Sequence, residues 1–217
     1  MASLSKSLEE YKSTFDSNTP VEILETINRS ISLLQEHANL RNCLQINTPF
    51  PPFALPDINQ HIVESKQLLT SGPLIITFIR GGWCPYCVLE IRAWQEQFEQ
   101  SKRKLNIIAI TPEKPLFAKS MQAENHLEFP LLFDPELCFA EQLGLLWQLN
   151  NEMKQALLKW NIDLTERNSD QTFNLPIPAT FVIDQNGLIK YRFIEEDYSL
   201  RAEPDEVLAT YHGLKGQ

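Results

Sequence analysis

One short stretch, residues 74–100, constrains the fold more than any other: LIITFIRGGWCPYCVLEIRAWQEQFEQ. Its first six residues form an apolar, β-branched run that predicts a buried strand. Two glycines end the strand, and apolar residues at helical spacing follow. Cys84 is therefore expected at the start of a helix, where free N–H groups and the helix dipole favour a thiolate. Cys87 lies one turn later, within reach of a disulfide, so the pair is predicted to be a working dithiol.

The Cys-Pro-Tyr-Cys motif is also compatible with half of a zinc site or with two inert core cysteines. A zinc site needs a second pair of ligands. Cys43 and Cys138 are isolated, and the four histidines show no ligand spacing, so we expect no metal and no cofactor. Pro85 argues against inert core cysteines, because proline at the first helical position preorganises the start of the helix.

Composition narrows the class of protein. A net charge of −9 over 217 residues argues against a nucleic-acid partner, and no basic run suggests binding to an anionic membrane. No apolar stretch reaches the roughly 18 residues that span a bilayer, and the first residues lack the apolar core of a signal peptide. Four cysteines are too few for a disulfide scaffold. We therefore expect a cytoplasmic redox enzyme.

The N-terminal residues, 1–46, are predicted to be a helical extension. Apolar residues recur three and four apart over residues 2–18 and again over 24–38. The second stripe is compatible with a homodimer seam, but its short length favours a helical hairpin that docks on its own domain. Four prolines between residues 49 and 56 exclude a helix there and predict a linker. The redox domain is assigned to residues 47–217.

That domain alternates strands and helices, with one interruption. Residues 105–111 and 129–133 are predicted strands, each followed by a helix. Residues 145–168 form a helical insertion that we expect to roof one side of the site. Two β-rich runs meet at Asn186-Gly187 and predict a hairpin. Because proline cannot donate to a β-ladder, a cis Ile177–Pro178 bond is predicted before the first of these runs.

The order of these elements resembles the thioredoxin fold, an α/β fold with a central mixed sheet flanked by helices. The combination of FALPD, RGGWCPYC and IPATFVID over residues 48–214 more closely resembles the peroxiredoxin-like branch of the alkyl hydroperoxide reductase/thiol-specific antioxidant (AhpC/TSA) family. The resemblance implies that Cys84 is the attacking cysteine and Cys87 its resolving partner. It also implies that Pro178 is the cis-proline beside the dithiol, with Ile177, Trp83 and Tyr86 completing a docking surface.

Several positions depart from the patterns of these groups. A peroxiredoxin carries threonine or serine where Gly81 stands and proline where Thr77 stands, and its arginine before the FVID-like strand is replaced by Pro178. The buried acid of ordinary thioredoxins is replaced by Phe78.

Two arginines are candidates to stabilise the thiolate in place of the missing groups. Arg80 lies at the end of the buried strand, where α/β sheets place their sites, and Arg92 lies on the helix. For Arg92 a surface role is favoured. Glu90 is a candidate proton carrier, but its helical face favours a surface position.

Taken together, the sequence and the resemblance predict a thiol peroxidase. Cys84 would reduce a hydroperoxide and form a disulfide with Cys87, which a thioredoxin- or glutathione-type donor would reduce. The alternative enzyme uses the same dithiol on disulfide substrates. A third hypothesis is a non-catalytic thioredoxin-fold module whose N-terminal helices bind a partner.

Overall fold

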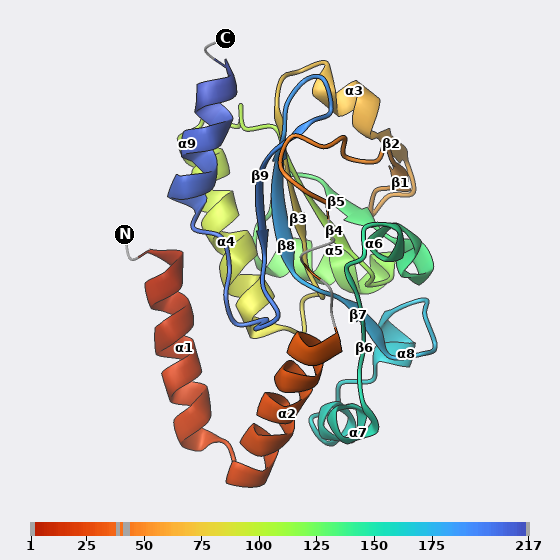
Figure 1. Ribbon diagram of the computed structural model, residues 1–217. Coiled ribbons are helices and arrows are strands. Elements are labelled where there is room, and N and C mark those ends of the chain that lie inside the picture. Colours follow the sequence, from red (N-terminus) through yellow and green to blue (C-terminus); the bar gives the residue numbers. More distant parts are fainter. Residues whose placement is uncertain (1–2, 38–39, 41–43, 216–217) are drawn as a thin grey trace.

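A five-stranded mixed sheet forms the centre of the computed structural model, which describes residues 3–37, 40 and 44–215 (Figure 1). The strand order is β5-β4-β3-β8-β9. Strands β3, β4 and β5 run parallel, whereas β8 is antiparallel to both β3 and β9. The strands are β3 (Leu74–Phe78), β4 (Ile107–Thr111), β5 (Leu131–Phe133), β8 (Ala179–Ile183) and β9 (Ile189–Ile194). Every residue of β3, β4 and β8 is buried, as the apolar runs predicted.

Helices α4 (Pro85–Gln100) and α9 (Pro204–Lys215) pack side by side on one face of this sheet (Figure 1). Successive side chains of a strand point to opposite faces. Thr77 of β3 pairs in register with Thr180 of β8, and both side chains contact α4. The next residue on each strand, Phe78 and Phe181, therefore faces the other side, where their rings meet each other.

Further elements complete the second face and the rim. Phe139 of helix α6 (Cys138–Gln142) packs on Phe78. The other elements around the sheet are the β1–β2 hairpin (Ala54–Pro56 and Ile62–Glu64), α3 (Ser65–Leu69), α5 (Pro115–Glu124) and a 3-10 turn (Pro135–Leu137). Both oxygens of the Asp134 carboxylate accept backbone N–H groups at the start of α6, which satisfies donors that have no partner within the helix.

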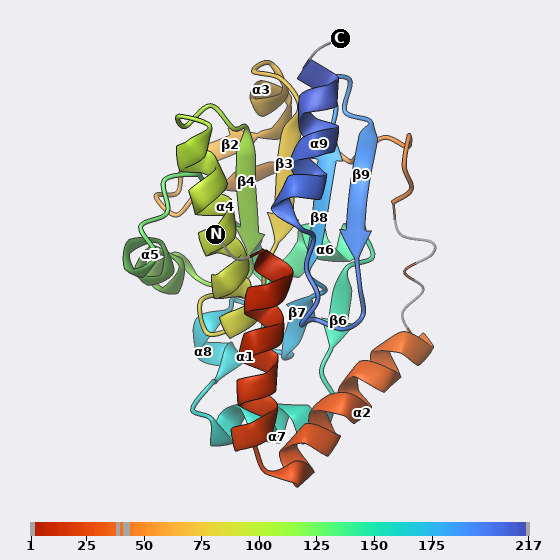
Figure 2. The ribbon, with the colours of Figure 1, turned by 90° about the vertical axis from the view of Figure 1, so that its left-hand side faces the viewer.

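The N-terminal helices pack on the rest of their own chain. Helix α1 (Leu4–Asn18) lies along α4, and α2 (Val21–His37) lies against α7 (Asn151–Lys159) (Figure 2). Ile27 and Leu34, two members of the apolar stripe of α2, are buried. The stripe is therefore covered within the chain, which agrees with the docked hairpin rather than with an open dimer seam. Cys43, which follows this stripe, falls outside the described residues.

The predicted insertion contains more than helices. Strand β6 (Leu146–Gln148) precedes α7, and β7 (Asn174–Pro176) follows α8 (Leu164–Arg167). The two strands pair antiparallel and form a small second sheet. Strands of three residues leave almost no periodic signal in the sequence, so this sheet was not predicted.

The predicted cis Ile177–Pro178 bond is wrong: this bond is trans, and the described residues contain no cis peptide bond. Pro178 lies between β7 and β8 rather than inside a strand. The Ile177 N–H donates to the Leu145 carbonyl at 2.6 Å, whereas the nitrogen of Pro178 lies where no ladder bond is required. A trans proline therefore fits here without the loss of a backbone hydrogen bond.

Of the helices in the described part of the chain, none has the length and apolar character needed to cross a membrane.

Candidate active site

The two cysteines of the motif lie at the beginning of α4, as predicted. Cys84 is the N-cap residue and Pro85 the first helical residue. The Cys84 N–H donates to the Gly81 carbonyl at 3.2 Å, and the Cys84 carbonyl accepts the first helical bond from Val88 at 3.0 Å. Both thiols are free and buried, with 1% and 0% of Cys84 and Cys87 exposed. Both sulfurs are thus enclosed by the protein at the first turn of α4.

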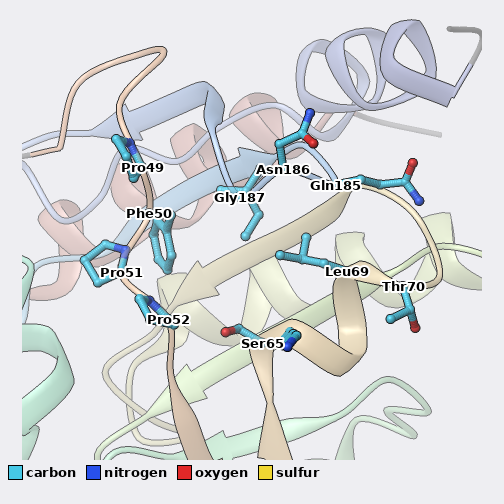
Figure 3. A pocket seen from close by; sticks show the side chains of 12 residues that line it. Pro49, Phe50, Pro51, Pro52, Ser65, Leu69, Thr70, Gln185, Asn186 and Gly187 are labelled. Carbon is cyan, nitrogen blue, oxygen red and sulfur yellow. The ribbon is translucent and has the colours of Figure 1, made fainter.

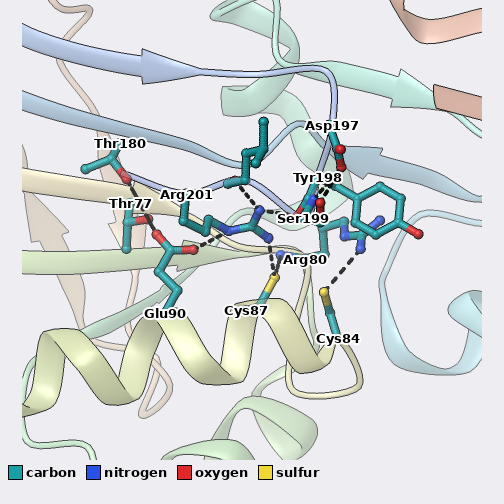
Figure 4. Close-up of polar contacts among 11 residues, drawn as sticks. Thr77, Arg80, Cys84, Cys87, Glu90, Thr180, Asp197, Tyr198, Ser199 and Arg201 are labelled. Carbon is teal, nitrogen blue, oxygen red and sulfur yellow. Dashed lines mark hydrogen bonds and ion pairs between the residues drawn. The ribbon is translucent and has the colours of Figure 1, made fainter. Parts of the chain in front are cut away.

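Arg80 is a cation in direct contact with the Cys84 sulfur. Its Nη2 donates to Cys84 Sγ at 3.1 Å (Figure 4). The guanidinium is buried and lies over the Tyr198 ring, 3.9 Å from the ring centroid. Ring contact and thiolate contact together hold the charge in one place. Arg80 therefore lies where its charge can act on the Cys84 sulfur.

The pKa values of the two thiols are shifted in opposite directions. Burial alone would raise the pKa of Cys84, but a hydrogen bond from the Cys87 thiol and the charges of Arg80 and Arg201 hold that pKa well below its usual range. Burial and the adjacent Cys84 sulfur raise the pKa of Cys87 well above its usual range. This arrangement suits a nucleophilic thiolate beside a partner that keeps its proton.

A buried ion pair that the sequence analysis missed lies behind the dithiol. Arg201 Nε donates to Glu90 Oε2 at 2.6 Å, and Arg201 Nη2 reaches Cys87 Sγ at 3.5 Å (Figure 4). The Thr77 hydroxyl donates to the other carboxylate oxygen of Glu90 at 2.5 Å. Burial raises the pKa of Glu90, and Arg201 and Thr77 offset part of that rise. Thr77, which stands where peroxiredoxins carry proline, thus anchors this network.

The structure corrects the surface position expected for Glu90 and agrees with the surface role favoured for Arg92. Glu90 was expected at the surface, but only 1% of it is exposed, because it lies on the face of α4 that meets the sheet and α9. Arg92 does not stabilise the thiolate: its side chain is exposed and its Nε donates to Asn125 Oδ1 at 2.6 Å. Arg201 was not a candidate, since it is 114 residues from Cys87 in sequence and carries no motif.

Gly81 has a structural reason to replace threonine or serine. The Glu113 carboxylate lies beside it and accepts the Gly82 N–H at 2.8 Å and Arg167 Nη1 at 2.7 Å. A Cβ on Gly81 would lie 2.4 Å from Glu113 Cδ, and its φ of +135° also disfavours a side chain. The turn before Cys84 is therefore built around a buried carboxylate.

A cavity of about 240 Å³ opens next to Cys84. Of the residues expected to form a docking surface, Trp83 and Tyr86 line this cavity, whereas Ile177 and Pro178 do not. The full lining is Tyr11, Phe15, Arg80, Trp83, Cys84, Pro85, Tyr86, Met153, Leu157, Trp160, Ile162 and Tyr198. The predicted insertion supplies part of this wall, so it does roof one side of the site.

A larger cavity, of about 680 Å³, lies elsewhere (Figure 3). Its lining includes Phe50, Leu69 and Ile183. Ile183 pairs with Leu74 at the first residue of β3, whereas Cys84 follows the last residue of that strand. This cavity is therefore at the opposite end of the sheet from the dithiol.

Across residues 3–37, 40 and 44–215, no group of three or more His, Cys, Asp or Glu side chains is arranged to hold a metal ion.

Comparison with known proteins places this geometry in a family. The AhpC/TSA family profile matches residues 46–192. Two proteins of Mycobacterium tuberculosis strains, both provisionally named peroxiredoxins, are 24% identical over 140 residues, which are 64% of this chain and 78% of theirs.

Solved structures agree in fold. The crystal structure of peroxidoxin BcpB from Mycobacterium tuberculosis superposes with a TM-score of 0.60 at 18% identity, covering 79% of this chain and 98% of that one. A peroxiredoxin-like protein from Aquifex aeolicus gives 0.60 at 14% identity, covering 79% and 88%. The thioredoxin-like fold predicted from the sequence is thereby confirmed. The chain belongs to the AhpC/TSA family.

Proposed function

We propose that this protein is a peroxiredoxin-type thiol peroxidase that reduces hydroperoxides through Cys84 and Cys87. The single observation that carries the proposal is the buried Cys84 sulfur, which accepts a hydrogen bond from Arg80 Nη2 at 3.1 Å and opens onto a cavity. A cation in this position keeps the sulfur ionised and is close enough to orient a peroxide oxygen. The thioredoxin-like fold and the membership of the AhpC/TSA family support the same chemistry.

The reaction follows from the unequal acidity of the two thiols. The Cys84 thiolate attacks the outer oxygen of ROOH, the O–O bond breaks, and RO⁻ takes up a proton and leaves as ROH (water when R is hydrogen). The sulfur becomes a sulfenic acid. The Cys87 sulfur then attacks it, the disulfide forms, and one water is released. Cys87 holds its proton until this step because its pKa is raised.

Two electrons must return to the disulfide before the next cycle. A dithiol of the thioredoxin type, or two thiols of the glutathione type, supplies them by exchange through a mixed disulfide.

Cytoplasmic location and a homodimer stay predictions from the sequence. The disulfide reductase alternative uses the same residues, since a Cys-x-x-Cys pair at a helix start also exchanges with disulfides.

The test mixes the reduced protein with hydrogen peroxide in a stopped-flow instrument and then maps the cysteines by mass spectrometry. We expect oxidation of Cys84 much faster than that of an unfolded thiol, followed by loss of two thiols and a bond between Cys84 and Cys87. The Cys87→Ser protein should stop at the sulfenic acid. The control Cys138→Ser, which removes an exposed thiol, should behave as the unmodified chain does.

Two results would contradict the proposal. Oxidation no faster than that of a free thiol, together with rapid reduction of a small-molecule disulfide, would favour the disulfide reductase. A Cys84 that alkylates no faster than Cys138 would favour the non-catalytic module.

A further inference from the structure

The wall of the Cys84 cavity contains residues that the family match does not include. Tyr11 and Phe15 of α1 line it. Helix α1 ends at Asn18, well before the matched segment, which starts at residue 46. Residues of the insertion, among them Met153 and Trp160, line the same cavity. An added helix and an insertion thus enclose the reacting sulfur.

Ring contacts show that α1 is part of the site and not a distant attachment. The Tyr11 ring meets the Tyr86 ring edge-on, with centroids 5.2 Å apart. Phe15 meets Trp160 edge-on at 6.0 Å. Burial raises the pKa of Tyr11, and the Cys84 charge raises it further. Helix α1 therefore bridges the turn that carries the cysteine and the insertion opposite.

Most of the lining is apolar. Among the described residues that line the cavity, the charged groups are the Arg80 guanidinium and the Cys84 thiolate. The Arg80 Nε is buried and, within the described structure, has no hydrogen-bond partner, and the same holds for Trp83 Nε1. Two donors near the sulfur are thus left without an acceptor from the described protein, and the rest of the wall is apolar apart from the tyrosine hydroxyls of residues 11, 86 and 198.

Size separates the candidate substrates. A water molecule occupies about 30 Å³ in the liquid, and hydrogen peroxide is only slightly larger. A cavity of about 240 Å³ leaves most of its apolar wall without contacts when it holds so small a molecule. An organic hydroperoxide fills it, with the O–O group at the donors and the carbon group against the rings.

We propose that Tyr11 and Phe15 of α1, together with the adjoining Trp160, form a substrate-selecting wall that favours a hydroperoxide with an apolar organic group over hydrogen peroxide. This inference rests on the peroxidase function proposed above and adds a role for the N-terminal helix. The covalent step is unchanged: Cys84 takes the outer oxygen, and the organic group leaves as its alcohol.

The experiment compares rate constants for oxidation of Cys84 by cumene hydroperoxide and by hydrogen peroxide. The unmodified protein is expected to react faster with cumene hydroperoxide. Phe15→Ala should lower that rate constant about tenfold, with the hydrogen peroxide rate changed by no more than about twofold. The control Leu158→Ala truncates a residue of α7 that is 39% exposed and does not line the cavity, and it should leave the ratio unchanged.

Binding gives a second readout that does not depend on turnover. The alcohol product of cumene hydroperoxide should bind the Cys84→Ser protein saturably, and more weakly when Phe15→Ala is added. Circular dichroism checks that each variant is folded.

The outcomes separate the two proposals. Slow oxidation by both peroxides would overturn the peroxidase function and the selectivity that rests on it. Rapid oxidation with a ratio that Phe15→Ala leaves unchanged, or a preference for hydrogen peroxide, would overturn the role of the wall alone. If the Phe15→Ala chain does not fold, failure of the Cys84→Ser protein to bind the alcohol overturns the wall.

Discussion

The buried ion pair between Arg201 and Glu90 makes a sharp prediction for stability. Both side chains are almost inaccessible, 2% and 1% exposed, and their atoms are 2.6 Å apart. Glu90→Gln keeps the shape and the acceptor for Thr77 but removes the negative charge. It leaves the Arg201 charge buried against only the carbonyls of Tyr198 and Leu200 and the sulfur of Cys87.

Removal of one partner from a buried pair costs about 3–5 kcal/mol of unfolding free energy, because the other charge stays desolvated and uncompensated. The amide oxygen of Gln still accepts one hydrogen bond, so we expect the lower end, about 3 kcal/mol. For a domain of this size that is a fall of about 6–12 °C in Tm. Adding Arg201→Met should recover part of the loss, since neither charge of this pair then remains.

The assay is urea unfolding of the reduced protein, followed by circular dichroism and supported by calorimetry. The matched control is Glu128→Gln. That residue pairs with Arg103 at 2.5 Å, but the two side chains are 38% and 65% exposed, so its loss should cost no more than about 1 kcal/mol. Equal effects of the two substitutions, or no recovery on adding Arg201→Met, would refute the assignment of a desolvated charge pair.

Three further predictions concern the thiolate and the turn before it. Arg80→Met should slow alkylation of Cys84 at about pH 7 by up to roughly thirtyfold, the limit set by an ordinary thiol with a pKa near 8.5. The control Arg92→Met, an exposed residue, should have no effect; a similar slowing in both would contradict the contact seen here. In the unmodified protein the lowered pKa keeps Cys84 ionised as pH falls, so its alkylation rate should stay near its maximum well below about pH 8.5, and a half-maximum near that value would disprove the lowered pKa. Gly81→Ala should destabilise the fold by about 2 kcal/mol more than Gly72→Ala, because both have positive φ but only a Cβ at Gly81 meets the buried carboxylate; equal losses in urea unfolding would rule out that clash.

Features that neighbouring residues encode were predicted correctly, whereas contacts between residues far apart in the chain were not. An apolar run, two glycines and a Cys-Pro-Tyr-Cys motif are adjacent in the chain, and they were enough to place Cys84 at the start of a helix. The amphipathic N-terminal helices and the hairpin at Asn186-Gly187 were found in the same way, because helical and strand periodicity are local properties.

Residues that meet only after folding were the ones missed or misplaced. Glu90 was assigned to the surface by its angle from Cys84 around the helix, but its burial depends on the position of α9 and of the loop that carries Arg201. The small sheet of β6 and β7 joins segments separated by two helices. The cis bond predicted at Pro178 is not needed, because this residue lies between two strands and not within one.

The sequence by itself determined the position of the Cys84–Cys87 pair at a helix start, the alternation of strands and helices around it, and the presence of helices before it. Only the tertiary structure decided which charges surround the two sulfurs, which acid is buried behind them, and that the first helix lines the site. The physical reason is that thiol ionisation and pocket shape depend on distances between side chains far apart in the chain. Those distances are set by sheet order and helix packing, and no local spacing encodes them.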